Sequence, residues 1–169
     1  MSPHILVLAA GASTRLGQPK QLVKLAGRPA LHIVVSNAVA VAGHAVTVVV
    51  GAHARDLTHL LSHSPASVIV NRQWQEGMAS SLRFGIASLP PACEAVMVLL
   101  GDQVAVTADD LKRLVSAWKG EASMIAASQP PDSRDGLASG VRRATVTIEC
   151  KAAPFATAPA CPAGWLIFP

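Results

Sequence analysis

Short apolar runs of strand length alternate with helix-like segments through the first 128 residues, and this alternation allows few folds. The apolar runs cover residues 5–9, 46–50, 68–70, 96–100 and 124–127. Helical patterns separate them at residues 29–41, 54–62, 80–88 and 107 to about 118. Strands that are covered on both faces read as continuous apolar runs. The pattern predicts an α/β fold: a doubly wound, mostly parallel sheet with residues 5–9 at its centre and helices on both faces.

Several helix ends carry local signals. Pro29 suits the first turn of one helix, and Gly43 lies just past its end. Thr107 and Asp110 resemble a capping box, in which each side chain accepts a hydrogen bond from a free backbone amide at the start of the helix. Ser80 is a candidate cap for the segment that it begins.

Cysteine content and charge limit the compartment and the partners. Cys93, Cys150 and Cys161 lie far apart and form no C-x-x-C pair. They argue against a disulfide framework or a structural zinc site and predict a cytoplasmic location.

No apolar run approaches the roughly 20 residues that span a bilayer, and residues 1–11 are interpreted as a strand and not as a signal peptide. The net charge of +4 comes from scattered basic residues, so we expect an anionic small ligand and neither a nucleic acid nor a membrane as partner.

Three unusual residues each come shortly after a predicted strand. Gly11, Asn71 and Asp102 follow their strands within two residues. Because right-handed crossovers place the loops after parallel strands along one edge of the sheet, we expect these residues to gather there. Open sheets of this kind bind their ligands at that edge. The sequence therefore predicts one site, formed by three loops.

The loop at residues 8–22, LAAGASTRLGQPKQL, carries the strongest chemical signal. Small residues such as Gly11 and Ser13 let backbone N–H groups approach an anion, and Arg15 and Lys20 neutralise a triphosphate. The spacing matches neither G-x-x-x-x-G-K-[ST] nor G-x-G-x-x-G. An ordinary turn between a strand and a helix is the alternative, but the two basic residues favour a phosphate-binding loop.

Four stretches together resemble one enzyme family. They are LAAGASTRLGQPKQL (8–22), KLAGRPAL (24–31), NRQWQEGMASSLRFGI (71–86) and VLLGDQ (98–103). The set is similar to the MobA-like nucleotidyltransferases, which move a nucleoside monophosphate from an NTP to a phosphate acceptor. Within this family it looks like the molybdenum cofactor cytidylyltransferases. The resemblance covers residues 4 to about 128 and implies a Rossmann-like nucleotidyltransferase fold with Mg²⁺ as cofactor.

The resemblance also implies roles for individual residues. Arg15 and Lys20 contact the phosphates in such enzymes, and Asp102 holds Mg²⁺, so these three residues form the implied catalytic set. A carboxylate at the end of a strand is able to coordinate a hard cation, although such aspartates are also common turn residues. The implied nucleotide-binding residues are Leu8, Ala9, Ala10, Gly11, Ala12, Ser13, Lys20, Asn71, Gly77, Ser81 and Asp102.

Other side chains have two interpretations. Ser81 either touches a ligand or only packs within its helix. Trp74 is a lid or stacking residue in one interpretation and a half-buried loop anchor in the other, which we favour. His59 and His63, four residues apart, are interpreted as surface residues and not as metal ligands.

The choice of substrates depends on few residues. In related guanylyltransferases the second alanine of the loop is typically glycine, so Ala10 favours CTP among the NTPs. The implied reaction moves CMP from CTP to the phosphate of a molybdopterin cofactor and releases pyrophosphate; a molybdoenzyme or its chaperone is the implied protein partner. One alternative is cytidylyl or uridylyl transfer to a sugar or polyol phosphate, which Gly-Asp-Gln at residues 101–103 disfavours. Another is a nucleotide-binding protein that does not catalyse transfer.

Residues 129–169 differ from residues 1–128, which we interpret as the nucleotidyltransferase core. The later segment holds six of the twelve prolines and two of the three cysteines. Two stretches that the family carries after its fifth strand are not found in it: aromatic-Gly-x-x-Gly-x-Pro, and Gly-Asp-x-Gly-Ala-Arg with a second metal-binding aspartate. A shifted reading frame, a truncation or divergence would each give such a segment. We therefore expect nucleotide binding with little turnover.

Overall fold

The computed structural model describes residues 3–14, 17–93, 95–117 and 147–150. Within these residues, five strands form one sheet in the order β5-β4-β1-β6-β7. Their bounds are β1 His4–Ala9, β4 Val46–Val50, β5 Ser67–Val70, β6 Ala95–Leu100 and β7 Thr147–Cys150. The pairs β1–β4, β1–β6 and β4–β5 are parallel, and β7 alone runs antiparallel to β6. The predicted mostly parallel sheet with β1 at its centre is confirmed.

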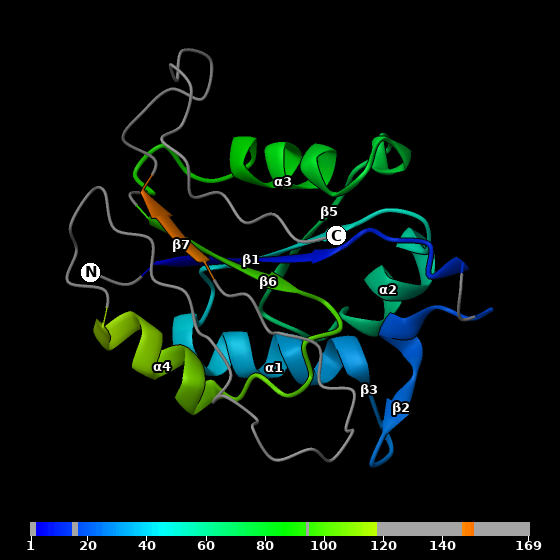
Figure 1. Ribbon diagram of the computed structural model, residues 1–169, viewed down its shortest axis with the longest axis horizontal. Coiled ribbons are helices and arrows are strands. Elements are labelled where there is room, and N and C mark those ends of the chain that lie inside the picture. The colour runs from blue at the N-terminus through cyan, green and yellow to red at the C-terminus, as the bar shows by residue number, and fades with distance from the viewer. Residues whose placement is uncertain (1–2, 15–16, 94, 118–146, 151–169) are drawn as a thin grey trace, which may run out of the picture.

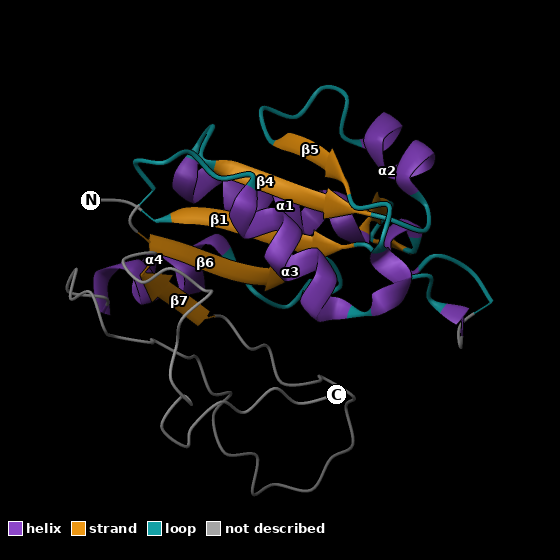
Figure 2. Cartoon of the chain, turned by 90° about the horizontal axis from the view of Figure 1, so that it is seen from above, coloured by secondary structure: helices purple, strands orange, loops and turns teal. Residues whose placement is uncertain are grey.

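Helices cover both faces of the sheet. They are α1 Ala30–Ala42, α2 Ala54–Leu60, α3 Met78–Ala87 and α4 Ala108–Ala117. In Figure 1, α3 lies on one side of the sheet and α1 and α4 lie on the other. Figure 2 shows the strands side by side, with β5 at one edge. This is the doubly wound arrangement that the alternation of strands and helices predicts.

The core has two parts because successive side chains of β1 point to opposite faces. Ile5 and Val7 pack in one cluster with Leu31 of α1 and Leu111 of α4. Leu6 packs in a second cluster on the α3 face. A fully buried aliphatic side chain contributes about 1.5–3 kcal/mol relative to an exposed one, so both faces of this strand need apolar residues. The uninterrupted run at residues 5–9 follows from this.

Most element boundaries agree with the sequence prediction within two residues. The helix α1 begins at Ala30, directly after Pro29, and Gly43 at its end has a φ of 58°. The sequence also allows a strand at residues 144–150, and β7 lies inside this range, whereas the predicted strand at residues 124–127 falls outside the described part of the chain.

The start of α3 differs from the prediction. This helix begins at Met78, directly after Gly77, whose φ of 102° favours glycine. Ser80 is therefore the third residue of the helix and not its cap. Its hydroxyl instead donates to the backbone oxygen of Gln73, at 3.0 Å. The interpretation of Ser80 as a helix cap is wrong because Gly77, three residues earlier, precedes the first residue of the helix.

The capping box of α4 is present as predicted. The backbone amide of Thr107 donates to Asp110 Oδ2 at 3.0 Å, and the amide of Asp110 donates to Thr107 Oγ1 at 3.2 Å. The Thr107 hydroxyl also donates to the same carboxylate. These hydrogen bonds, with the side-chain bond the largest cause, hold the pKa of Asp110 below its usual value.

A two-stranded hairpin lies between the first loop and α1. It pairs β2 (Lys24–Leu25) with β3 (Arg28–Pro29) in antiparallel register. The two turn residues, Ala26 and Gly27, have φ values of 48° and 80°, as the tight turn of a two-residue hairpin loop requires. Strands of two residues have no measurable periodicity, so the sequence pattern does not indicate them.

None of the helices in the described ranges is both long and apolar enough to cross a membrane.

Candidate active site

A cavity of about 300 Å³ opens beyond the carboxyl ends of β1 and β6 and beside the start of α3. Its walls come from β1, β6, the segments that follow β1, β5 and β6, and the start of α3, and the lining residues are Leu8, Ala10, Gly11, Lys20, Gln21, Trp74, Gln75, Gly77, Met78, Ser81, Leu100, Gly101 and Asp102. Seven of the sequence-predicted site residues are among them: Leu8, Ala10, Gly11, Lys20, Gly77, Ser81 and Asp102. The predicted meeting of three loops at one edge of the sheet is therefore present.

The other predicted residues lie behind or outside this lining. Ala9, Ala12, Ser13 and Asn71 do not line the cavity, and Arg15 is outside the described residues. Ala9 is the last residue of β1, so its neighbours Leu8 and Ala10 face the cavity in its place. Ala9, Ala12, Ser13 and Asn71 instead form hydrogen bonds that support the cavity wall from behind.

Gln21 joins three parts of the first loop. Its side chain is only 3% exposed. The side-chain Nε2 donates to the backbone oxygens of Ala9 at 3.4 Å and Gly11 at 3.1 Å. The hydroxyl of Ser13 donates to Gln21 Oε1 at 3.2 Å and accepts from the backbone amide of Lys20 at 3.1 Å. One buried amide thus connects the end of β1 to the turn that carries Lys20.

The loop after β4 holds two further carbonyl groups of the first loop. The oxygen of Ala10 accepts from the amide of Ala52 at 3.1 Å, and that of Ala12 accepts from His53 Nε2 at 3.2 Å. In a trans peptide the C=O and the following N–H point in opposite directions. The N–H groups of Gly11 and Ser13 therefore point away from the loop after β4, and that of Ala12 points away from Gln21; no acceptor among the described residues pairs with any of the three. Successive free amides of this kind favour an anion.

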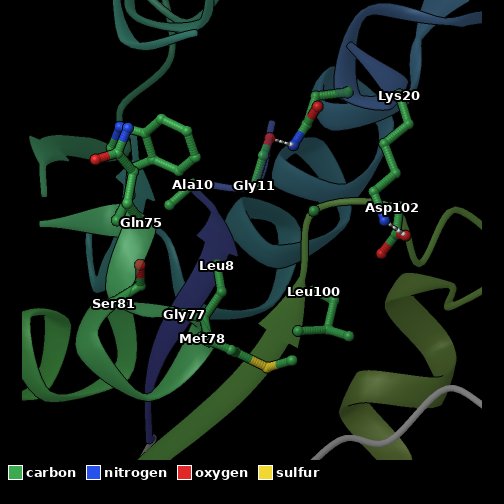
Figure 3. A pocket seen from close by; sticks show the side chains of 13 residues that line it. Leu8, Ala10, Gly11, Lys20, Gln75, Gly77, Met78, Ser81, Leu100 and Asp102 are labelled. Atoms are coloured by element: carbon green, nitrogen blue, oxygen red, sulfur yellow. Dashed lines mark hydrogen bonds and ion pairs between the residues drawn. The ribbon is translucent and has the colours of Figure 1, made fainter. Parts of the chain in front are cut away.

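Lys20 and Asp102 form the charged side of the cavity. Lys20 Nζ lies 2.8 Å from Asp102 Oδ2, and the two side chains are 46% and 36% exposed. Figure 3 shows this pair on one side of the cavity, with Ser81 and Gln75 on the other and Ala10 and Gly11 between. Exposed ion pairs contribute only about 0–1 kcal/mol. A ligand that pairs with both charges separately is therefore able to separate them at little cost.

Asp102 is held close to the first loop by the residue before it. The amide of Gly101 donates to the backbone oxygen of Leu8 at 2.8 Å. A Cβ on Gly101 would lie 2.9 Å from the Cβ of Ala9 and 3.1 Å from Leu31 Cδ1. Only glycine fits this approach of β6 to β1. The Gly-Asp pair thus brings a carboxylate next to the loop of free amides.

The opposite side of the cavity is mostly apolar. Leu8, Leu100 and Met78 line it, and Met78 is 50% exposed. Trp74 is half-buried and packs over Gly51, where an added Cβ would lie 2.6 Å from the Trp74 Cβ. Trp74 therefore has the partial burial of the anchor that we favoured and also forms part of the wall.

Asn71 organises the start of α3 from behind the cavity. It is 2% exposed, and its Nδ2 donates to the hydroxyl oxygens of Ser80 and Ser81, both at 3.1 Å. Its Oδ1 accepts from the amide of Gln73 at 2.9 Å. Ser81 lines the cavity and is 3% exposed. Its hydroxyl oxygen accepts from Asn71, and no acceptor among the described residues takes its hydroxyl hydrogen.

Sequence reasoning missed several contributors to this site. Gln21 belongs to a quoted motif, directly after Lys20, but only the folded loop shows that it reaches Ala9 and Gly11. His53 follows β4 at the same edge of the sheet, which is the one signal that would have indicated it. His59 and His63 are exposed, as predicted.

The chain is similar to known proteins in sequence. Residues 5–160 match the family model described as MobA-like NTP transferase domain, which extends past residue 128, where the resembling stretches end. The nicotine blue oxidoreductase of Paenarthrobacter nicotinovorans is 33% identical over 111 residues, 65% of this chain and 54% of that protein. The bifunctional protein GlmU of Sorangium cellulosum is 35% identical over 120 residues, 66% of this chain and 25% of GlmU. The chain thus spans about half of one relative and a quarter of the other.

Solved structures share the fold. The crystal structure of Rv0371c from Mycobacterium tuberculosis H37Rv gives a TM-score of 0.65 at 30% sequence identity and covers 78% of this chain and 68% of that chain. The complex of the same protein with manganese gives a TM-score of 0.62 at 25% identity, over 78% of this chain and 66% of that chain. These similarities agree with the parallel sheet and flanking helices described above.

Proposed function

The chain belongs to the MobA-like NTP transferase family, and on this premise we propose that it moves CMP from CTP to the phosphate of a molybdopterin cofactor. Pyrophosphate is the second product. The observation that carries the proposal is the division of one cavity into a charged side with free backbone amides and an apolar side with one hydroxyl donor. A nucleoside triphosphate has the same division between its phosphates and its base.

The charged side suits a triphosphate. The N–H groups of residues 11–13 have no acceptor in the described ranges, and of these residues Gly11 lines the cavity together with Lys20. Charge-assisted hydrogen bonds from lysine and backbone amides to phosphate oxygens are among the strongest in proteins. Arg15, two residues beyond Ser13, is the second cation that we propose for the phosphates.

The apolar side suits a pyrimidine base. Leu8 and Met78 offer apolar surface for the ring, and Ala10 carries the methyl group that distinguishes this loop from a glycine-containing one. The hydroxyl of Ser81 has a hydrogen to donate, which complements a carbonyl oxygen such as O2 of cytosine. Asn71 contributes by holding this hydroxyl in place.

Mg²⁺ fits beside Asp102. One oxygen of this carboxylate contacts Lys20, and the other has no partner among the described residues. No cluster of three or more metal-binding side chains occurs in the described part of the chain. This matches Mg²⁺, which commonly takes one or two carboxylates and completes its coordination with phosphates and water. When bound, the ion adds positive charge that neutralises the phosphates.

The transfer forms one bond and breaks one bond. An oxygen of the acceptor phosphate bonds to the α-phosphorus of CTP, and the bond from that phosphorus to the bridging oxygen breaks, so pyrophosphate leaves with the electron pair. Lys20 and the amides of residues 11–13 stabilise the negative charge on the departing phosphates. The loop donors are already oriented before the substrate arrives, which is where such sites gain most of their rate.

Transfer of radiolabel tests this proposal. The protein is incubated in the presence of Mg²⁺ and in excess over [α-³²P]CTP. We expect label to appear on molybdopterin and not on sugar or polyol phosphates. Residues 129–169 lack the family's second metal-binding aspartate motif, so the rate should be lower by about a hundredfold or more than with two such carboxylates. Lys20→Ala should remove the transfer. Label on a sugar phosphate would reassign the acceptor, and nucleotide binding without any transfer would leave a binding protein.

The cytoplasm is the compartment that we propose for the reaction, with a molybdoenzyme or its chaperone as receiver of the product. Cys93 is a free thiol in the structure, and unpaired cysteines suit a reducing compartment.

A further inference from the structure

One buried side-chain amide contacts the first loop at three points. Gln21 is 3% exposed and contacts the backbone of Ala9 and Gly11 and the side chain of Ser13. We propose that Gln21 is a positioning residue that holds the loop in the form that binds the triphosphate. This inference rests on the proposed function, because it assigns a role in the binding of the same nucleotide.

The hydrogen-bond network fixes the orientation of the Gln21 amide. Backbone carbonyl oxygens only accept hydrogen bonds, so the NH₂ group must face Ala9 and Gly11. The amide oxygen then faces the Ser13 hydroxyl, which donates to it at 3.2 Å. Both N–H hydrogens of the amide are thereby used within the protein. Gln21 acts through the loop and is not itself a donor to the phosphates.

The orientation of one peptide group follows directly from Gln21. When the carbonyl of Gly11 points to Gln21 Nε2 at 3.1 Å, the N–H of Ala12 in the same peptide plane must point the opposite way. The bonds of Ala10 and Ala12 to the loop after β4 act similarly on the neighbouring amides. Gln21 therefore orients the middle one of the three free amides.

A second effect reaches Lys20. The Ser13 hydroxyl that donates to Gln21 also accepts from the backbone amide of Lys20, at 3.1 Å. Ser13 itself has a φ of 54°, a left-handed conformation that non-glycine residues adopt at a cost. Gln21 supports this unfavourable conformation through its contact with the hydroxyl. Loss of the Gln21 side-chain amide should therefore increase the mobility of two parts of the loop. These are the backbone N–H groups of residues 11–13 and the backbone of Lys20.

The substitution Gln21→Met tests the role, because methionine has a similar length and no hydrogen-bonding amide. A loop that must be ordered by its ligand binds more weakly, and an unsatisfied buried carbonyl adds to the loss, so we expect about tenfold weaker binding. The loss should be the same for CTP and for inorganic tripolyphosphate, and absent for cytidine, which lacks phosphates. Binding is measured by displacement of a fluorescent nucleotide.

Gln73→Met is the matched control, since Gln73 is exposed and does not line the cavity. It should leave all three affinities unchanged. Circular dichroism and the melting temperature report whether Gln21→Met folds. If it does not, Gln21→Asn keeps the amide but is one methylene too short to reach both carbonyls, and the same selective loss is expected.

The outcomes separate this inference from the proposed function. Equal binding of tripolyphosphate by the wild type and Gln21→Met would overturn the positioning role alone. Parallel loss for cytidine and tripolyphosphate would also overturn it, because it would indicate general damage to the fold. A wild-type protein that binds neither CTP nor tripolyphosphate would overturn the proposed function itself.

Discussion

Lys20 and Asp102 neutralise each other at the mouth of the cavity, 2.8 Å apart. Their roles in the proposed reaction are different, since the lysine pairs with phosphate and the carboxylate with the metal. Both side chains are more than a third exposed, so the ion pair contributes little to stability. Substitution of either residue should therefore change binding much more than it changes folding.

The two substitutions should have distinct effects on CTP binding. Asp102→Ala should remove the increase in affinity that Mg²⁺ gives, because the metal loses its one carboxylate in the described site. Lys20→Ala should weaken CTP by about tenfold or more with or without Mg²⁺, since a charged hydrogen bond to phosphate is lost. Calorimetry with and without Mg²⁺ measures both. If Asp102→Ala keeps the Mg²⁺ effect, Asp102 does not hold the metal.

At the scale of elements, α3 positions Ser81 through its close approach to the sheet. Gly85 faces the sheet, and a Cβ there would lie 2.7 Å from both Cδ atoms of Leu6 and 3.0 Å from Val49 Cγ2. Leu6 and Val49 are fully buried, so neither side chain has open space to move into. Glycine thus sets the distance between this helix and the sheet.

Gly85→Ala should destabilise the protein although alanine is the better helix former. The propensity gain is about 1 kcal/mol, whereas overpacking of a well-packed core costs about 1–3 kcal/mol. We expect a net loss of stability by urea unfolding, together with weaker CTP binding because α3 shifts. Arg83→Ala on the exposed face of α3 is the control and should change the free energy of unfolding by less than about 0.5 kcal/mol. A more stable Gly85→Ala protein would contradict this packing argument.

His4, at the start of β1, is a titratable residue whose pKa is changed by burial. His4 Nε2 lies 2.9 Å from Thr47 Oγ1, and burial lowers the pKa of His4 from 6.5. Below pH 6.5 the unfolded chain therefore binds a proton that the folded chain does not, and stability present at neutral pH is lost as the pH falls.

His4→Gln should reduce this loss of stability. Urea unfolding measures the free energy of unfolding at pH 7.5 and at pH 5.5. The decrease between these pH values should be smaller in His4→Gln than in the wild type by a few tenths of a kcal/mol, because solvent screens this half-exposed site. His59→Gln, at an exposed position, should lose as much as the wild type. Equal losses in all three proteins would show that His4 does not contribute.

The sequence predicted the elements whose pattern is set by burial. Strand β4 is buried along its length and β1 from Ile5 onward, so their apolar runs indicate them directly. The hairpin of β2 and β3 was missed because two residues define no period. The start of α3 was misplaced because the positive φ of Gly77 is a property of the folded chain.

The site was predictable in place but only partly in detail. Strand order placed Gly11 and Asp102 at one edge, and both line the cavity. The role of Gln21 was not predictable, because it depends on a loop that brings its amide to Gly11, ten residues earlier. Asn71 was predicted to bind the nucleotide, whereas in the structure its side-chain contacts hold Ser80 and Ser81.

At the scale of the whole molecule, one sheet joins the two halves of the cavity. Strands β1 and β6 contribute Leu8 and Leu100 to the cavity and lead into the loops that carry Lys20 and Asp102, and the start of α3, which packs on the same sheet, adds Met78 and Ser81. Nucleotide binding should therefore stabilise the entire fold and not one loop. By mass action, a ligand at a hundred times its Kd stabilises by about 2.7 kcal/mol.

The melting temperature with different nucleotides tests the central claim most directly. At equal concentrations with Mg²⁺, CTP should raise the melting temperature more than GTP or ATP, because we propose that Ala10 and Ser81 select a pyrimidine base. Equal shifts with all three would indicate recognition of the triphosphate without selection of the base. A larger shift with GTP, or no shift with any nucleotide, would contradict the assignment of this cavity to CTP.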